Sequence, residues 1–246
     1  MDGAVLGIFL FATFVGGVVA GLAGFAMSLV VSGVWLHILT PVQTVTLIVG
    51  YGLLVQGSGI WTLRHALSWR RVAPFIISGT VGVPIGVALL SYIAPVHLRT
   101  FVGLLLIVYS AYGLMRPAIK PIKAGGPAEV TIGFINGILG GLTGLAGIVV
   151  VVWCQLRGWP KDVQRTISQP VSFAAFVVSA ISLSVTGSIA ADTVELFLLG
   201  LPLVLAGTWT GLKLYGRFDD VAFRRIVLLL LLASGISLVL PARIFH

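Results

Sequence analysis

Charged residues are scarce in this chain of 246 residues, of which Asp, Glu, Lys and Arg together make up 9%. A water-soluble domain carries roughly a quarter charged residues. Hydrophobic residues account for 58%, and no charge occurs between Gly3 and Leu63. The composition therefore excludes a soluble globular protein. It predicts an integral, polytopic α-helical membrane protein, since a helix crosses the hydrocarbon core in about 20 apolar residues.

Cysteine is almost absent, and the sequence signatures of enzymes are missing. The one cysteine, Cys154, lies in an apolar run, so no disulfide can form within the chain. The sequence contains no HExxH or CxxC motif, no phosphate-binding loop and no carboxylate pair within an apolar segment. We therefore expect no enzymatic activity, no catalytic residues, no cofactor and no metal. The N-terminus lacks a basic region and a cleavage site, so we do not expect a signal peptide.

Glycine, in contrast, is abundant, and it is concentrated in two similar stretches, "GGVVAGLAGFA" at 16–26 and "GILGGLTGLAG" at 137–147. A shift of 120 positions superposes the two stretches, and a shift of 125 superposes two later pairs of glycines: Gly17 with Gly137, Gly21 with Gly141, Gly82 with Gly207, and Gly86 with Gly211. Matches in the same order indicate an internal repeat. We predict a first membrane repeat at residues 1–115, a cytoplasmic linker at 116–129 and a second repeat at 130–246, together one transmembrane domain.

The distribution of basic residues favours an inverted repeat. Each half has four apolar segments: 4–38, 41–63, 72–93 and 98–115, then 130–156, 164–186, 193–214 and 223–240. Single crossings by all eight would leave seven basic residues on one side and eight on the other, against the positive-inside rule. If the first segment of each half instead turns back at its glycines, thirteen basic residues share one side and only Arg99 and Arg243 lie opposite.

The predicted fold is therefore an all-α polytopic membrane protein of two inverted-topology repeats. Each repeat has a glycine-rich re-entrant helical hairpin, or a broken first helix, plus three transmembrane helices. Irregular backbone at membrane depth is tolerated only where protein buries it or where it lines a wet cavity. Gly21–Phe25 and Gly141–Gly147 are the candidate tips. Close helix packing of the GxxxG kind is the alternative account of these glycines.

Broken helices at a repeat interface commonly bind the substrate of a transporter, and a helix that begins after such a break directs its N–H groups at an anion. The predicted substrate-binding residues are the two tips and nearby polar side chains: Gly21, Leu22, Ala23, Gly24, Phe25, Ala26 and Ser28; Thr143, Gly144, Leu145, Ala146 and Gly147; Gln56 and Gln169. Structural alternatives remain open. Small-residue packing explains Ser28 and Thr143 equally well, an interhelical hydrogen bond explains Gln56, and a helix start explains Gln169–Pro170.

The chain resembles the TauE/SafE family of membrane permeases, described as sulfite and organosulfonate exporters. The resemblance covers nearly the whole chain. It rests on "GGVVAGLAGFAMSLV" and "GGLTGLAGIVVV", followed by Thr40–Pro41 and Trp159–Pro160, and on the stretches "GTVGVPIGVALL" and "AGTWTGLKLYGRF". It implies movement of small sulfur-containing anions such as sulfite, sulfoacetate or other organosulfonates. The family's glycine-rich segments map onto Gly21–Ala26 and Gly141–Gly147.

We therefore expect a multi-pass exporter of the inner (plasma) membrane. Its expected partners are a small anionic substrate, the lipid bilayer and, as one option, a second copy in a homodimer, but not nucleic acid. Two alternatives stay open: uptake or export of another small organic anion such as a carboxylate, and a non-transporting membrane scaffold.

The charge distribution yields a prediction about topology. Both termini should lie outside, and the linker at 116–129 should be cytoplasmic. In a Cys154→Ala background, a cysteine placed at position 122 should not react with an impermeant thiol reagent added from outside. Labelling at that position, or a cytoplasmic C-terminus, would contradict the inverted repeat.

Overall fold

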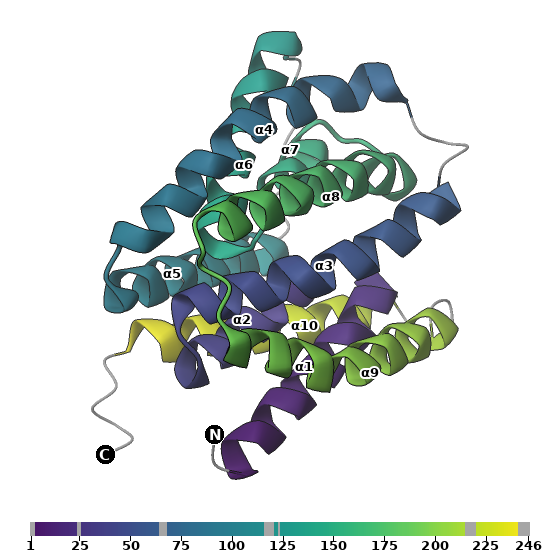
Figure 1. The fold of residues 1–246 in the computed structure, drawn as a ribbon. Helices are drawn as coiled ribbons and strands as arrows, with labels where there is room; N and C mark the ends of the chain where they lie inside the picture. Colours follow the sequence, from purple (N-terminus) through teal and green to yellow (C-terminus); the bar gives the residue numbers. More distant parts are fainter. Residues whose placement is uncertain are drawn as a thin grey trace. The chain divides into compact units, whose positions relative to one another are not determined.

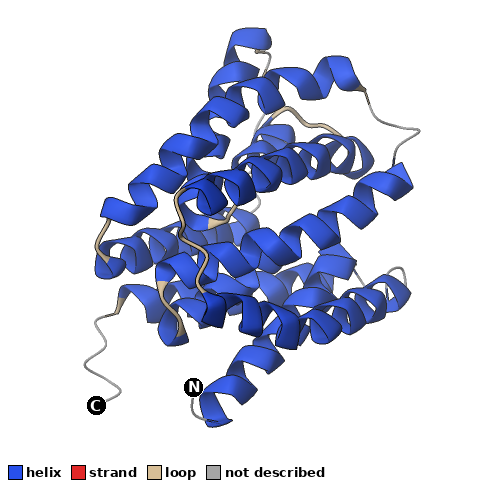
Figure 2. Cartoon of the chain, in the orientation of Figure 1, coloured by secondary structure: helices blue, strands red, loops and turns tan. Residues whose placement is uncertain are grey.

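The computed structural model describes residues 3–23, 26–63, 68–115, 121–122, 124–214 and 220–240, the side chains of 23, 61–63, 161–162, 220–224 and 226 excepted. Figure 2 shows that these residues form helices and connecting loops, without a strand. The helices are α1 (Gly3–Ala23), α2 (Met27–Ile38), α3 (Pro41–Leu63), α4 (Trp69–Tyr92), α5 (Pro95–Met115), α6 (Gly126–Thr143), α7 (Ile148–Leu156), α8 (Lys161–Val185), α9 (Ala191–Leu214) and α10 (Asp220–Val239) (Figure 1).

The apolar segments of the sequence correspond closely to these helices. Six of the eight segments are single helices, whereas the first segment of each half is broken into two. The break follows Ala23 in the first half and Thr143 in the second. A broken first helix in each half, as predicted from the glycines, is thereby confirmed.

The chain folds into two compact units. One comprises Met1–Thr44, Ile93–Ala118 and Leu198–His246, and the other comprises Val45–Tyr92 and Ile119–Phe197. Each unit therefore combines helices from both halves of the sequence. The opposite orientation of the halves and the repeat boundaries around 116–129 stay predictions.

In the first unit, α1 and α2 form an antiparallel helical hairpin. Phe9 stacks on Trp35 with ring centroids 5.2 Å apart, whereas Gly16, closer to the break, lies against Met27 and Val31. The sequence separation of the contacting residues thus increases with their distance from the break, as is expected of two antiparallel helices joined by a turn. On another face of α1, Gly17 packs against the backbone of α9 at Thr208 and Gly207.

In the second unit, α6 packs against α4 through small residues. A Cβ added to Gly137 would lie 2.8 Å from the Cα of Gly79, and one added to Gly141 would lie 3.0 Å from the backbone nitrogen of Val87. Such distances leave no room for a side chain, so the two helix backbones are in direct contact.

The same arrangement therefore occurs in both units. Glycines of the first helix in one half pack against the third segment of the other half, at and around its glycine pair. Gly17 and Gly21 contact Gly207 and Gly211, and Gly137 contacts Gly82. Gly141 packs on Val83 and Val87, and Gly86 packs on Ile138 and Leu142. These are the positions that the two sequence shifts superpose. Helix packing, the alternative account of Gly17, Gly21, Gly137 and Gly141, is thus what the structure shows for these four glycines.

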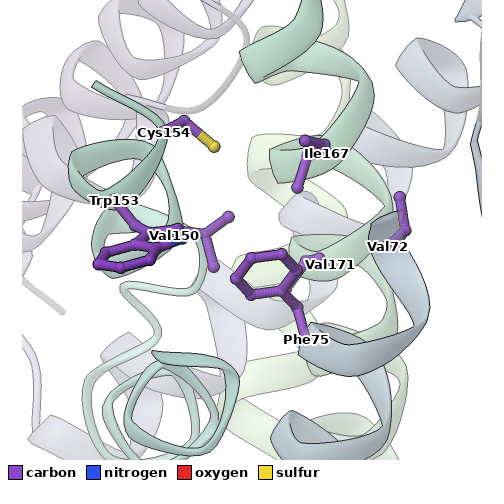
Figure 3. Packing of buried hydrophobic residues seen from close by; sticks show 7 residues of the cluster. All are labelled: Val72, Phe75, Val150, Trp153, Cys154, Ile167 and Val171. Carbon is purple, nitrogen blue, oxygen red and sulfur yellow. The ribbon is translucent and has the colours of Figure 1, made fainter. Parts of the chain in front are cut away.

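A cluster of buried side chains holds the short helix α7 between α4 and α8. Val150, Trp153 and Cys154 of α7 face Ile167 and Val171 of α8, and α4 contributes two further side chains, Val72 and Phe75 (Figure 3). A helix of nine residues is not stable by itself. This apolar contact therefore stabilises α7 and fixes its position.

Five helices in the described part of the chain are long and apolar enough to cross a membrane: Gly3–Leu22, Trp69–Tyr92, Pro95–Met115, Val163–Val185 and Ala191–Leu214. Many of their large apolar side chains are exposed, such as Ile77 at 68% and Leu198 at 59%. An outward apolar surface on helices of this length is typical of contact with lipid.

The α4–α6 contact yields a prediction about stability. Replacing Gly137 with Ala should destabilise the purified protein by about 1–3 kcal/mol, because the added methyl group displaces the α4 backbone. Gly126→Ala on the same helix is the matched control, because a Cβ there meets nothing within 4 Å. Thermal unfolding in detergent would measure both, and equal melting temperatures for the two variants would contradict the packing described.

Candidate functional site

The break between α6 and α7 is built by two glycines in left-handed conformations. Gly144 has φ 74° and caps the C-terminus of α6, its N–H donating to Gly140 O at 2.9 Å. Gly147 has φ 98° and stands immediately before α7. Residues with a side chain rarely adopt such values, so this turn requires glycine at both positions. We call residues 144–147 the α6–α7 tip.

Hydrogen bonds from neighbouring side chains close the α6–α7 tip. Asn136 Oδ1 accepts the N–H of Gly147 at 2.9 Å, Ser172 Oγ donates to Ala146 O at 3.2 Å, and Thr143 Oγ1 accepts the N–H of Leu145 at 3.2 Å. The tip is buried, with Leu145 and Ala146 only 1% and 4% exposed. These bonds satisfy backbone groups that would otherwise be unpaired in an apolar surrounding.

The first N–H groups of helix α7, at the tip, have no acceptor in the part of the chain that the structure describes. Its sequence, "IVVVVWCQL", starts with five β-branched residues that disfavour a helix in water. The first N–H groups of a helix, here those of Ile148, Val149 and Val150, have no acceptor within it, and no side chain caps α7. Ile148 and Val150 are nevertheless buried.

The electrostatic environment of this helix start is positive without any charged side chain. The aligned peptide dipoles of a helix place roughly half a positive charge at its N-terminus. The segments that surround the tip carry no Asp, Glu, Lys or Arg over 130–156 and 166–191, nor does α3. The arrangement therefore favours an anion, and no side-chain charge competes for it.

The two ends of the α6–α7 segment lie together. Ile122, just before α6, donates its N–H to Leu156 O at the end of α7, at 2.9 Å. Arg157 donates from its guanidinium to Ala124 O and lies over the rings of Trp153 and Trp159, with its Cζ 6.0 and 5.2 Å from the ring centroids. The end of α7 therefore lies beside the residues that precede α6, so the α6–α7 segment folds back on itself at the tip.

Helix lengths indicate how deep the tip would lie in a bilayer. With nine residues, α7 is about 13.5 Å long, roughly half of a hydrocarbon core of about 30 Å. Arg157 and two tryptophans stand at its C-terminal end, a combination typical of a membrane interface. An α7 anchored there would begin near the middle of the membrane.

Helices α3 and α8 line the same region of the second unit. Ile48 of α3 touches Gly144 at the tip, and farther along α3 a Cβ added to Gly59 would lie 2.7 Å from Gln169 Oε1 of α8. Gln56 is on the face of α3 that carries both residues, since 48, 52, 56 and 59 repeat at helical spacing.

The two glutamines are 4% and 5% exposed, and neither Oε1 has a hydrogen-bond partner among the described residues. Pro170 lies inside α8, which begins at Lys161. The alternative that Gln169–Pro170 starts a helix is therefore wrong. The helix start was placed too late in the sequence because Lys161 and Asp162 are charged, so the first turn of α8 is not apolar.

The predicted site residues divide between the two units. Gln56, Thr143, Gly144, Leu145, Ala146, Gly147 and Gln169 all belong to the second unit. Thr143 is the last residue of α6, and its hydroxyl is engaged, donating to Leu139 O at 2.7 Å.

The remaining predicted residues belong to the first unit. Gly21, Leu22 and Ala23 are the last residues of α1, where Gly21 packs on α9, and Ala26 and Ser28 are buried at the start of α2. Gly24 and Phe25 lie outside the described residues. The tips are thus shorter than predicted, because Gly21 and Gly141 are still helical.

The sequence matches the family described as "Sulfite exporter TauE/SafE" over residues 8–238. The chain belongs to this family. It is similar to the "Probable sulfite/organosulfonate exporter TauE" of Cupriavidus necator, with 27% identity over 234 residues that cover 89% of this chain and 88% of the relative. No solved structure matches.

Membership of the TauE/SafE family makes this chain a multi-pass membrane transporter and not an enzyme. The predicted family and the predicted class, an all-α polytopic membrane protein, are thereby confirmed, whereas the inverted orientation of the repeats stays a prediction.

Two residues that hold the tip of this family member were missed from the sequence, Asn136 and Ser172. Asn136 lies eleven residues before the glycine that it bonds, and Ser172 lies on another helix. A signal for Asn136 was present, since it is the only asparagine in the chain and stands in an uncharged stretch. Nothing in the sequence distinguishes Ser172 from other serines of the apolar segments.

The tip yields a prediction about transport. Gly147→Ala should abolish it, because the new methyl group meets Ser172 Oγ and the residue must keep a positive φ. Gly187→Ala is the matched control: Gly187 has φ 64° but open space around it, so it should lose about 1 kcal/mol and retain transport. Efflux from proteoliposomes and the amount of inserted protein would be compared. Normal efflux by the Gly147 variant would contradict a role for the tip.

Proposed function

We propose that the protein exports a small sulfur-containing anion, namely sulfite, sulfoacetate or another organosulfonate, across the inner membrane. The single observation that supports a site is the buried start of α7, where three N–H groups have no acceptor among the described residues and where the stretches 130–156 and 166–191 carry no charge. The family description and the name of the relative support the substrate class. A carboxylate would fit the same helix start, but neither comparison points to one, and membership of a transporter family argues against a scaffold.

A helix start suits a transporter because it binds an anion without holding it strongly. The dipole of a helix contributes about 0.3–1 kcal/mol to the binding of a charge, up to about 2 kcal/mol where partly buried. A buried Arg or Lys would itself require a partner in the absence of substrate. The N–H groups of a helix start carry no net charge, so they need no counter-ion after the anion has left.

The proposed substrate contacts are the α6–α7 tip with Thr143, and the buried amides of Gln56 and Gln169, which lie on the helices that enclose it. Gly21, Leu22, Ala23, Gly24, Phe25, Ala26 and Ser28 form the corresponding proposed contacts of the first half. The proposed topology has both termini outside and the 116–129 linker in the cytoplasm.

Export of an anion from a negative cytoplasm needs no coupled ion, because the membrane potential supplies about 2.3 kcal/mol per charge per 100 mV. Proteoliposomes holding sulfite or sulfoacetate should therefore release it faster when valinomycin and a potassium gradient make the interior negative. Removal of a pH gradient alone should not slow the release. Empty liposomes and the Gly147→Ala protein are the controls.

Two outcomes would contradict this proposal. Absence of efflux for every sulfur-containing anion tested would reject the substrate class. Efflux that ignores the potential and stops without a pH gradient would reject passive export and implicate a titrating group, for which His37 and His97 are the histidines to replace. Of these, His37 Nδ1 lies 2.9 Å from Gly33 O and Nε2 lies 3.2 Å from Ser237 Oγ.

A further inference from the structure

Asn136 is the only asparagine among the 246 residues, and it is completely buried on α6. It lies two turns before the end of that helix, within the stretch 130–156 that carries no charge. A fully buried amide in such surroundings must satisfy one acceptor and two N–H donors from the groups around it.

The orientation of this amide is fixed by its environment. The N–H of Gly147 lies 2.9 Å from Asn136 Oδ1, and an N–H can donate only to the oxygen and not to the NH2 group. The amide therefore cannot be flipped. Its nitrogen, Nδ2, is carried on the same carbon, next to the residue that precedes α7.

Nδ2 of Asn136 has no acceptor among the described residues. An unsatisfied buried donor is costly and calls for an explanation. The structural task at the tip, to accept the N–H of Gly147, needs only the oxygen. A serine, threonine or aspartate side chain also offers an oxygen, so the capping role does not account for the NH2 group.

The NH2 group of Asn136, which has no acceptor among the described residues, lies close to the helix start. The N–H groups of Ile148, Val149 and Val150 lack an acceptor within α7, and Asn136 Nδ2 is held beside the residue that precedes them. Together they are a set of donors with no acceptor in the described part of the chain, within stretches of sequence that carry no negative charge. The ligand that fits has several oxygens on one atom and a negative charge, as the SO3 group of sulfite and of sulfonates does.

We propose that Asn136 is a specificity-determining residue, whose Nδ2 donates a hydrogen bond to an oxygen of the sulfur oxyanion bound at the start of α7. The inference rests on the proposed function and adds a side chain to a site otherwise made of backbone. The helix dipole attracts any negative charge, whereas the NH2 group adds a donor at a second, fixed position. An anion with several oxygens can bond that donor and the N–H groups of α7 together, which a single halide ion does less well. Asn136 thus favours oxyanions over halides.

Because the chain has a single asparagine, this contact can be observed without resonance assignment. Full-length protein in detergent, labelled with 15N in asparagine only, has one side-chain NH2 group to report. Titration with sulfite or sulfoacetate should shift its two proton signals to a plateau. The midpoint should equal the Kd obtained from stabilisation against heat. Chloride at equal ionic strength should leave the signals in place.

Substitution separates this contact from the capping role. Asn136→Asp keeps an oxygen for the N–H of Gly147, removes the NH2 donor and places a carboxylate beside the bound anion. At pH 8 it should raise the Kd for sulfite and for sulfoacetate by at least roughly tenfold, because the lost hydrogen bond to an ion and the repulsion between the two negative charges act in the same direction. Gln164→Glu is the matched amide-to-acid control. The side chain of Gln164 donates to the backbone oxygen of Trp159, which precedes α8, so this variant should leave the Kd unchanged.

The outcomes distinguish the inference from the function on which it rests. If wild-type protein binds and exports a sulfur oxyanion while the NH2 signals stay fixed, the inference is wrong and the function stands. The same holds if Asn136→Asp binds as tightly as wild type, or if chloride shifts the signals equally. If no sulfur oxyanion stabilises wild-type protein or is exported by it, both fail. The NMR titration needs no variant, so it decides the matter even if Asn136→Asp does not fold.

Discussion

The second unit depends on one constraint: a helix that breaks in an apolar environment must find partners for the backbone groups that the break exposes. At the α6–α7 tip, three polar side chains supply them: Asn136, Thr143 and Ser172. They come from the helix before the break and from α8, so the tip is held to two helices at once. Among the described residues, no side chain bonds the N–H groups at the start of α7, and these are the groups that we propose bind the substrate.

The helices around the break are held in place by close contact between their backbones. Apolar contact alone gives little force between helices in lipid, so close approach of backbones has to provide it. The contact of α6 with α4 across Gly137 and Gly79 meets this need, as does that of α1 with α9 across Gly17 and Gly207. The buried cluster around Trp153 and Cys154 fixes α7. Glycine thus has two separate uses in this chain, one at turns and one between helices.

The chemistry of the site is set by what surrounds it. A cavity lined by arginines would bind an anion strongly and would need counter-charges when empty, whereas a helix start in uncharged surroundings meets neither difficulty. Membership of the TauE/SafE family establishes transport, and the geometry of α7 gives a physical reason why an anion is a suitable cargo. Arg157 and its two tryptophan neighbours stand at the other end of α7, where a positive charge complements the negative end of the dipole.

The sequence by itself determined the membrane class, the family, the eight apolar segments and the break in the first segment of each half. These properties depend on local composition: hydropathy, charge and the presence of glycine within an apolar run. Only the tertiary structure decided which glycines form a turn and which pack between helices. Gly141 and Gly144 are equally free to turn in the isolated chain, but contact with α4 keeps the first in a helix, and the left-handed turn at the second brings the chain to Asn136. The roles of Asn136 and Ser172 were likewise decided by folding, because each acts on a backbone group that is distant in sequence and near only once the chain has turned back.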